Sequence, residues 1–333
     1  MNTKLLLDVD PGNDDAIALF IALAADDIDL IGVTTVAGNT TVDNATENTL
    51  SLLELVDRAD VPVVKGADRP LVDELVMAEH IHGPNGLPET VRETLPAPTQ
   101  EPVDQHAVDF ILEQASEYGE ELTIAALGPQ TNIALALAKE PNLPEMVGDI
   151  YQMGGALKTT GNVTPQASFN FYVDAVAAAR VVQNARPKIV GLDVTEHVYV
   201  DTEDILALAE EPTPLPTMAA ILEFSIEEVR SKFGHDGGLA SDAVVLLISS
   251  PTRSNLRKRT SKSTHRVVLR TAQRFTMSMM STKSRRTVRW HSMWMGMRIN
   301  GRLLRIFYCF VTEGVCFRLR GAAIAAFSGS FTN

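Results

Sequence analysis

Short apolar runs alternate with segments of helical periodicity from the N-terminus to about residue 250, and this alternation is the strongest constraint on the fold. The apolar runs occupy residues 4–7, 30–36, 61–64, 122–127, 150–153 and 188–192. Strands that alternate with helices form βαβ units around a parallel sheet. We therefore predict an α/β fold, with a single open, mostly parallel sheet and helices on both of its faces, built as one domain from residues 1–250.

Charge divides the chain near Pro251. Residues 1–250 contain 12 Lys and Arg against 41 Asp and Glu, whereas residues 251–333 contain 17 against one. The acidic first part argues against binding to nucleic acid, and the overall composition is that of an ordinary soluble chain. Because the first residues, MNTKLLLDVD, lack the apolar core of a signal peptide, we expect a cytoplasmic protein with neither membrane nor nucleic-acid partners.

The tail, residues 251–333, differs from the rest in more than charge, since it contains both tryptophans and six of the eleven methionines. A basic arm that binds nucleic acid is one interpretation. We prefer a frameshifted gene, because Met and Trp each have a single codon. The stretch MWMGM at residues 293–297 requires ATG TGG ATG GGN ATG, and regrouping by one base yields Val-Asp-Gly at its centre. We therefore expect the tail to be anomalous in structure.

The stretch DVDPGNDD at residues 8–15 places four aspartates where a strand passes into a helix. Acids are favoured at a helix N-terminus, which accounts for Asp14 and Asp15 without any function. Asp8 and Asp10 need another cause, because neighbouring carboxylates raise one another's pKa unless a cation holds them. With oxygen ligands and neither Cys nor His in the motif, that cation should be Ca²⁺ or Mg²⁺. Ligands of open α/β sheets bind at the carboxyl ends of strands, where this stretch lies.

Six further motifs follow the acidic stretch. The ordered set is DVDPGNDDAIAL (8–19), TTVAGN (34–39), HGPNGL (82–87), ALGPQTNIALAL (126–137), MGG (153–155), GNVTPQASFNFYVD (161–174) and SDAVV (241–245). Over about the first 248 residues the chain resembles the inosine-uridine preferring nucleoside hydrolases, a family of calcium-dependent N-ribohydrolases. The resemblance implies a Rossmann-like nucleoside hydrolase fold, hydrolysis of the N-glycosidic bond of purine or pyrimidine ribonucleosides to free base and ribose, a role in nucleoside salvage, and a homo-oligomer, either dimer or tetramer.

Residue by residue, the resemblance also implies roles in the site. Asp14 would be the general base that activates the attacking water, and His82 would lie in a mobile loop over the site. Apart from the resemblance, we expect Asp8 to support the metal ligands from behind. The implied ligands of Ca²⁺ are Asp10, Asp15, the backbone carbonyl of Leu127, and Asp242. The implied ribose-binding positions are Asn39, Asn162, Ser168 and Asn170.

Several residues of these motifs also have a simpler explanation. Asn39 could be a turn residue after a strand, and His82 could be a solvated loop histidine. Thr131 or Asn132 could cap the helix that follows GPQ. Asp242 could be an ordinary acid at a helix start.

Two positions depart from the family. Ser168 stands where members usually have a Glu that contacts the ribose, and Ser241 stands where many members have a His near the leaving base. A hydroxyl does not titrate near neutral pH and is a poor acid there. The proton for the leaving base is therefore unassigned, and His82, His235 or solvent could supply it.

Two other functions compete with nucleoside hydrolysis. The departures and the tail motivate a ribose-binding or nucleoside-binding pseudoenzyme. An apolar strand that ends in DxD also resembles the phosphohydrolases of the haloacid dehalogenase type, in which Asp8 would attack phosphorus and Asp10 would act as the acid. That motif expects Thr or Val where Gly12 stands.

Overall fold

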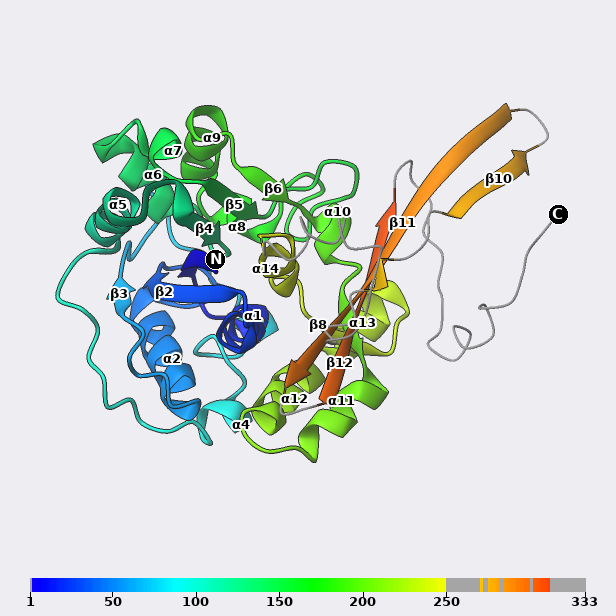
Figure 1. The fold of residues 1–333 in the computed structure, drawn as a ribbon, viewed down its shortest axis with the longest axis horizontal. Helices are drawn as coiled ribbons and strands as arrows, with labels where there is room; N and C mark the ends of the chain where they lie inside the picture. Colours follow the sequence, from blue (N-terminus) through cyan, green and yellow to red (C-terminus); the bar gives the residue numbers. More distant parts are fainter. Residues whose placement is uncertain (1, 250–269, 272–274, 282–283, 300–301, 312–333) are drawn as a thin grey trace.

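The computed structural model describes residues 2–249 and the strand segments 270–271, 275–281, 284–299 and 302–311. A six-stranded sheet in the order β3-β2-β1-β4-β5-β6 forms its centre (Figure 1), and every neighbouring pair in it is parallel. Its strands are β1 (Thr3–Val9), β2 (Ile28–Thr35), β3 (Val63–Lys65), β4 (Leu122–Ala126), β5 (Asp149–Met153) and β6 (Lys188–Val190). Each overlaps one of the six apolar runs, which confirms the predicted α/β fold.

Strand β1 lies in the middle of the sheet and is buried on both faces. Leu5, Leu6 and Leu7 are all fully buried. Leu5 and Leu7 join the apolar cluster on one face, whereas Leu6 joins the cluster on the other face, because successive side chains of a strand point to opposite sides. Each buried leucine contributes about 1.5–3 kcal/mol of hydrophobic free energy, so this run anchors the sheet from which the acidic stretch emerges.

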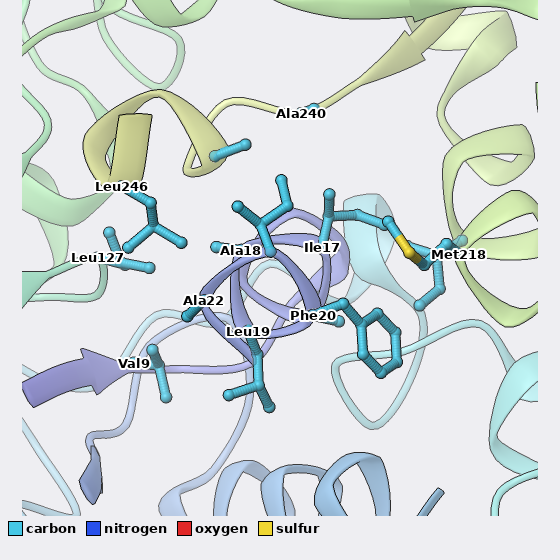
Figure 2. Packing of buried hydrophobic residues seen from close by; sticks show 14 of the residues in the cluster. Val9, Ile17, Ala18, Leu19, Phe20, Ala22, Leu127, Met218, Ala240 and Leu246 are labelled. Carbon is cyan, nitrogen blue, oxygen red and sulfur yellow. The ribbon is translucent and has the colours of Figure 1, made fainter. Parts of the chain in front are cut away.

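Helix α1 (Asn13–Ala24) follows β1 directly and is apolar on all sides. Its residues 16–22 are all buried, as expected for a helix in the interior of a domain. Figure 2 shows the helix end-on, with Met218 of α12 (Leu215–Phe224), Leu246 of α14 (Ala243–Ser249) and Leu127 around it. This packing fixes the position of the first turn of α1, where Asp14 and Asp15 lie.

Helices cover both faces of the sheet, whereas the helices between residues 202 and 233 lie to one side of it (Figure 1). Leading up to β4 they are α2 (Val42–Leu55), α3 (Glu79–His82), α4 (Glu89–Arg92), α5 (Ala107–Tyr118) and the short 3₁₀ helix η1 (Gly119–Glu121). After β4 they are α6 (Thr131–Lys139), α7 (Leu143–Met146), α8 (Phe169–Val173), α9 (Ala175–Asn184), α10 (Leu192–Thr195), α11 (Thr202–Ala209) and α13 (Ile226–Phe233). None of the helices in the described part of the chain has the length and apolar character needed to cross a membrane.

Two smaller antiparallel sheets complete the described structure. One pairs β7 (Tyr199–Asp201) with β8 (Gly237–Leu239). The other contains β10 (Phe275–Ser281), β11 (Ser284–Ile299) and β12 (Arg302–Val311), with β9 (Arg270–Thr271) beside β11. The predicted change of composition at Pro251 falls in residues 250–269, which lie outside the described residues. The division into residues 1–250 and 251–333, and the frameshift, therefore remain predictions.

Candidate active site

The strand order reverses beside β1, since β2 and β3 lie on one side of it and β4, β5 and β6 on the other. A sheet of this kind binds its ligand at such a reversal, outside the carboxyl ends of the strands. The chain leaves β1 at this point through Pro11 and Gly12 and enters α1. A Cβ atom added to Gly12 would lie 2.7 Å from the side chains of both Asn39 and His82. The turn therefore requires glycine because two other segments approach it closely.

Three carboxylates gather at this turn. One ligand atom from each of Asp14, Asp15 and Asp242 lies within 4.8 Å of the other two. Asp15 and Asp242 are buried, whereas Asp14 is half-buried. Asp242 comes immediately before α14, more than 200 residues away in sequence from α1, and the packing of α14 beside α1 brings it here. The described part of the chain thus contains a compact acidic cluster assembled from two distant segments.

Asp10 is fully buried, and it lies near enough to Asp14 and Asp15 for their charges to act on it. Its Oδ2 accepts a hydrogen bond of 2.7 Å from the backbone N–H of Asn39. Burial raises the pKa of Asp10, of Asp15 and of Asp242, and in each case the neighbouring carboxylates raise it further. Oδ1 of Asp10 and Oδ1 of Asp242 have no hydrogen-bond partner among the described residues.

The donor set suits a hard cation. All the groups are oxygens, mutual repulsion disfavours their charged forms, and two buried oxygens are unpaired. Such a set could hold a divalent metal ion, since hard cations prefer oxygen ligands and a positive charge would offset the repulsion.

The backbone carbonyl of Leu127, another predicted ligand, also faces the site. The N–H of Leu127 donates 2.8 Å to the carbonyl oxygen of Asp8, and Leu127 lines the same cavity as the acidic cluster. The carbonyl of Leu127 accepts a hydrogen bond from the side-chain amide of Asn170, which also donates 3.3 Å to the carbonyl of Met153. Asn170 is therefore placed beside the carboxylates, at the ends of β4 and β5.

Asn39 and His82 hold the acidic turn from the opposite side. The side-chain amide of Asn39 donates 3.3 Å to Oδ2 of Asp15, so Asn39 is more than a turn residue. Nδ1 of His82 accepts a hydrogen bond of 3.1 Å from the backbone N–H of Asn13, at the start of α1. Burial lowers the pKa of His82. The neutral ring therefore carries its proton on Nε2, and α3 is fastened to the N-terminus of α1.

The remaining ribose-binding candidates lie in the 161–170 segment. Asn162 is exposed and its Oδ1 accepts 2.9 Å from the backbone N–H of Phe169. Ser168 is buried, and its Oγ accepts 2.6 Å from the N–H of Gly155. Gly154 and Gly155 both have positive φ angles, 131° and 86°. The Ser168 hydroxyl thus stabilises the glycine turn after β5, a role that the sequence did not indicate.

Ser241, which departs from the family, and His235, a candidate for the leaving-base proton, both have other partners. Ser241 is buried and its hydroxyl donates 3.4 Å to the carbonyl of Thr195. The ring of His235 stacks on the ring of Tyr199 with centroids 4.6 Å apart. Neither residue lines the cavity that contains the acidic cluster.

Two buried polar residues behind the site were missed. Asn132 donates 2.8 Å to Oδ1 of Asp8 and 2.9 Å to the carbonyl of Thr35, and accepts 2.9 Å from the N–H of Ala67. It does not cap α6, whose N-cap residue is Gln130. Thr131 also does not cap the helix.

The hydroxyl of Thr131 instead donates 2.8 Å to Asp174. The carboxylate of Asp174 also accepts from the backbone N–H groups of Leu71 and Ala177. The only available signal for Asn132 and Asp174 was their position in the GPQTN and NFYVD motifs.

The cavity has a volume of about 160 Å³ and is lined by segments from across the chain. Asp14, Asp15 and Asp242 form one part of its wall, and the amides of Asn39 and Asn170 form another. Glu228 and Lys232 of α13 also line it, although nothing in the sequence marked them. A cavity with carboxylates and amides can bind a small polyhydroxylated molecule. A half-buried carboxylate such as that of Asp14 can remove a proton from a water molecule beside it.

Comparison with known proteins agrees with this geometry. A family model described as inosine-uridine preferring nucleoside hydrolase matches residues 5–301. The pyrimidine-specific ribonucleoside hydrolase RihA of Escherichia coli strain K12 is 41% identical over 229 residues, which is 68% of this chain and 72% of the relative.

Solved structures give the same result. A plant nucleoside hydrolase, PpNRh1, superposes with a TM-score of 0.71 at 34% identity, covering 76% of this chain and 80% of its own. A purine-preferring ribonucleoside hydrolase from Gardnerella vaginalis superposes with a TM-score of 0.70 at 30% identity, covering 75% and 80%. The fold, the acidic cavity and these matches together show that the chain belongs to the inosine-uridine preferring nucleoside hydrolase family and is a hydrolase that acts on nucleosides.

Proposed function

We propose that the protein cleaves the N-glycosidic bond of ribonucleosides to give free base and ribose, with Ca²⁺ as its cofactor and Asp14 as the general base. The observation that carries the proposal is the cavity in which Asp14, Asp15 and Asp242 meet within 4.8 Å. Asp14 is the more exposed member of that cluster, so it is the carboxylate best placed to meet a water molecule.

The metal would be held by buried oxygens. Asp10, Asp15, Asp242 and the carbonyl of Leu127 supply an all-oxygen set, and the unpaired Oδ1 atoms of Asp10 and Asp242 support this assignment. Ca²⁺ accepts six to eight such ligands with flexible geometry, whereas Mg²⁺ demands a near-ideal octahedron. When bound, the ion would supply Lewis-acid activation of water and additional binding to sugar hydroxyls.

The protein's own groups would act on both partners of the reaction. Cleavage of a glycosidic bond passes through a sugar cation, which nearby carboxylates stabilise. Asp14 would take the proton from the attacking water as its oxygen bonds to the anomeric carbon. Asn39 and Asn170 offer amide groups at the cavity wall for the ribose hydroxyls, and Asn162 would join them from the 161–170 segment.

Phosphoryl transfer by the DxD motif is poorly supported. Asp8, which would have to attack phosphorus, is fully buried. Its Oδ1 accepts hydrogen bonds of 2.6 Å from the Thr34 hydroxyl and 2.8 Å from the Asn132 amide. A carboxylate in that position cannot reach a substrate in the cavity, and it serves instead to support the turn that carries Asp10.

A variant pair tests the proposed function. Asp14→Ala should lower kcat on nucleosides by about 10²–10⁴-fold while Ca²⁺ still binds, because it removes the base and leaves the buried ligands. Asp10→Ala should lose Ca²⁺, as measured by calorimetry. Asp26→Ala, an exposed acid beyond the end of α1, is the control and should behave as the unaltered protein.

The products identify the reaction class. Free base and ribose from a nucleoside panel support the proposal, and phosphate released from phosphoesters would support the phosphohydrolase. Binding without turnover would support a pseudoenzyme. Wild-type turnover by Asp14→Ala would show that the base is assigned wrongly.

We also propose a cytoplasmic homo-oligomer, a dimer or tetramer, that serves nucleoside salvage. The family membership supports these assignments. Light scattering by the purified protein in solution measures the mass of the assembly.

A further inference from the structure

We propose that Lys232, held in place by Glu228, is the cationic group that stabilises the leaving base. This inference rests on the proposed function, because it concerns the second half of the same reaction. It assigns the role left open by Ser241, which stands where many family members carry a histidine.

Lys232 is the only lysine or arginine among the described residues that line the cavity. It lies on α13, one turn after Glu228, and its Nζ is 2.5 Å from Oε1 of Glu228. The Lys232 side chain is 50% exposed and that of Glu228 31% exposed. The ion pair therefore restricts the ammonium group to the cavity wall while leaving it in contact with solvent.

The charges of α13 also act on residues of neighbouring segments. Glu228 raises the pKa of His82, in opposition to the larger lowering by burial. Lys232 lowers the pKa of Glu196, in opposition to the larger raising by burial. The Lys232–Glu228 pair is thus close enough to influence groups from α3 and from the segment after α10.

Three other side chains that could act on the leaving base already have partners in the structure. The hydroxyl of Ser241 donates to Thr195 and is buried. His235 stacks on Tyr199 and does not line the cavity. Nδ1 of His82 accepts from the backbone of Asn13, and burial disfavours the charged form of its ring. His80 also lines the cavity, but Lys232 is the group whose ammonium, with three N–H donors, is held at the cavity wall by an ion pair with Glu228.

The chemistry balances without any further reagent. As the C1′–N bond breaks, its electron pair moves onto the base, and the oxygen of water bonds to C1′. Asp14 takes one proton from that water. The Lys232 ammonium donates a hydrogen bond to the base as negative charge develops on it. Solvent water then gives the departed base its proton, and Asp14 returns the proton that it took to solvent.

A comparison of two substrate classes tests this role. Lys232→Met keeps the length of the side chain and removes the charge. We expect it to lower kcat/KM on inosine and uridine by about 10²-fold, a typical loss for one charge-stabilising donor. On 4-nitrophenyl riboside, whose leaving group departs as a stable anion, we expect a change of less than about threefold, because that leaving group needs little charge stabilisation.

Three variants control the comparison. Lys232→Arg keeps the positive charge and should retain nucleoside activity within about tenfold. Glu228→Gln keeps the shape of the partner side chain and should lose less than Lys232→Met. Lys139→Met removes an exposed lysine at the end of α6 that pairs with Asp109 and does not line the cavity, and it should match the unaltered protein on both substrates.

The outcomes are distinct. Nucleoside activity of Lys232→Met within threefold of the unaltered protein would overturn the inference, and so would an equal loss on both substrate classes. An equal loss in Lys232→Arg and Lys232→Met would also overturn it. If the unaltered protein cleaves neither class of riboside, the proposed function fails, and this inference fails with it.

Discussion

Asp8 is a carboxylate in the centre of a parallel sheet, and its surroundings explain how the chain tolerates it. Thr34 and Asn132 both donate to its Oδ1, whereas its Oδ2 has no partner among the described residues. Burial raises the pKa of Asp8 to about 6, and the two hydrogen bonds reduce that rise. The folded protein therefore holds a proton on Asp8 at pH values where the unfolded chain has lost it.

This pKa predicts how stability depends on pH in the metal-free protein. The pKa of Asp8 in the folded protein lies above its value of about 3.9 in the unfolded chain. The stabilising contribution of Asp8 to the free energy of unfolding is therefore present below pH 4 and is lost as pH rises through 6. We expect Asp8→Asn to match the unaltered protein near pH 4 and to exceed it at pH 7, by on the order of 3 kcal/mol.

The measurement is urea unfolding in EDTA at pH 4 to 8. Taking the difference between the two proteins cancels the opposite contribution of the half-buried histidines His82 and His197, whose pKa values are lowered by partial burial. A difference that stays constant across the range, or that favours the unaltered protein at pH 7, would contradict the prediction.

At the scale of elements, α6 is joined to the sheet by one polar side chain. Asn132 is fully buried and links the start of α6 to Asp8 in β1, to Thr35 in β2 and to Ala67 in the loop after β3. These contacts satisfy a buried amide from both ends. They align the carboxyl ends of three strands, which is where the metal ligands and Asn39 emerge.

We predict that Asn132→Ala lowers the free energy of unfolding by about 2–5 kcal/mol, because the N–H of Ala67 and an oxygen of Asp8 lose their partner in the interior. Asn184→Ala is a suitable control. Asn184 is exposed at the end of α9, and its side chain donates to the carbonyl of Arg180 on the same helix, so its loss should cost less than about 0.5 kcal/mol. Denaturant unfolding of both variants gives the comparison, and a cost below 1 kcal/mol for Asn132→Ala would refute the role.

At the scale of the whole molecule, the alignment with a relative and the family model cover different lengths of the chain. The alignment with RihA covers 72% of that relative, so about a quarter of its length has no counterpart in the aligned part of this chain. The family model, in contrast, continues to residue 301. Past Pro251 the composition changes from acidic to basic, and a segment of different composition is poorly suited to complete the same core.

We predict that the gene carries a one-base insertion or deletion between codons 245 and 255, and that an acidic reading frame continues beyond it. Sequencing that region in all three frames tests the first part. A chain expressed from the restored frame should melt at least about 4 °C higher than this one, which corresponds to 1–2 kcal/mol for a domain of this size. Equal cooperative melts, with a tail that resists protease, would contradict the second part.

Much of this organisation can be predicted from the amino-acid sequence. The six strands of the central sheet follow from local apolar runs, because strand and helix periodicities are imposed by neighbouring residues. The acidic turn at residues 8–15 follows from Pro-Gly between a strand and a helix. The family motifs located the carboxylates, and Asp14, Asp15 and Asp242 indeed meet in one cavity.

Other features arise from contacts between segments far apart in the chain. Lys232 and Glu228 line the cavity because the fold brings α13 to it, although α13 lies more than 200 residues after α1 in the sequence. Their spacing on the helix is that of any surface ion pair. Local rules offered Asn132 as a helix cap, whereas in the structure Asn132 binds Asp8. The resemblance implied a ribose contact for Ser168, and the structure adds a hydrogen bond from Gly155 to Ser168 at the cavity wall. A polar side chain takes the partner that the assembled fold brings within about 3 Å, and no local pattern contains that information.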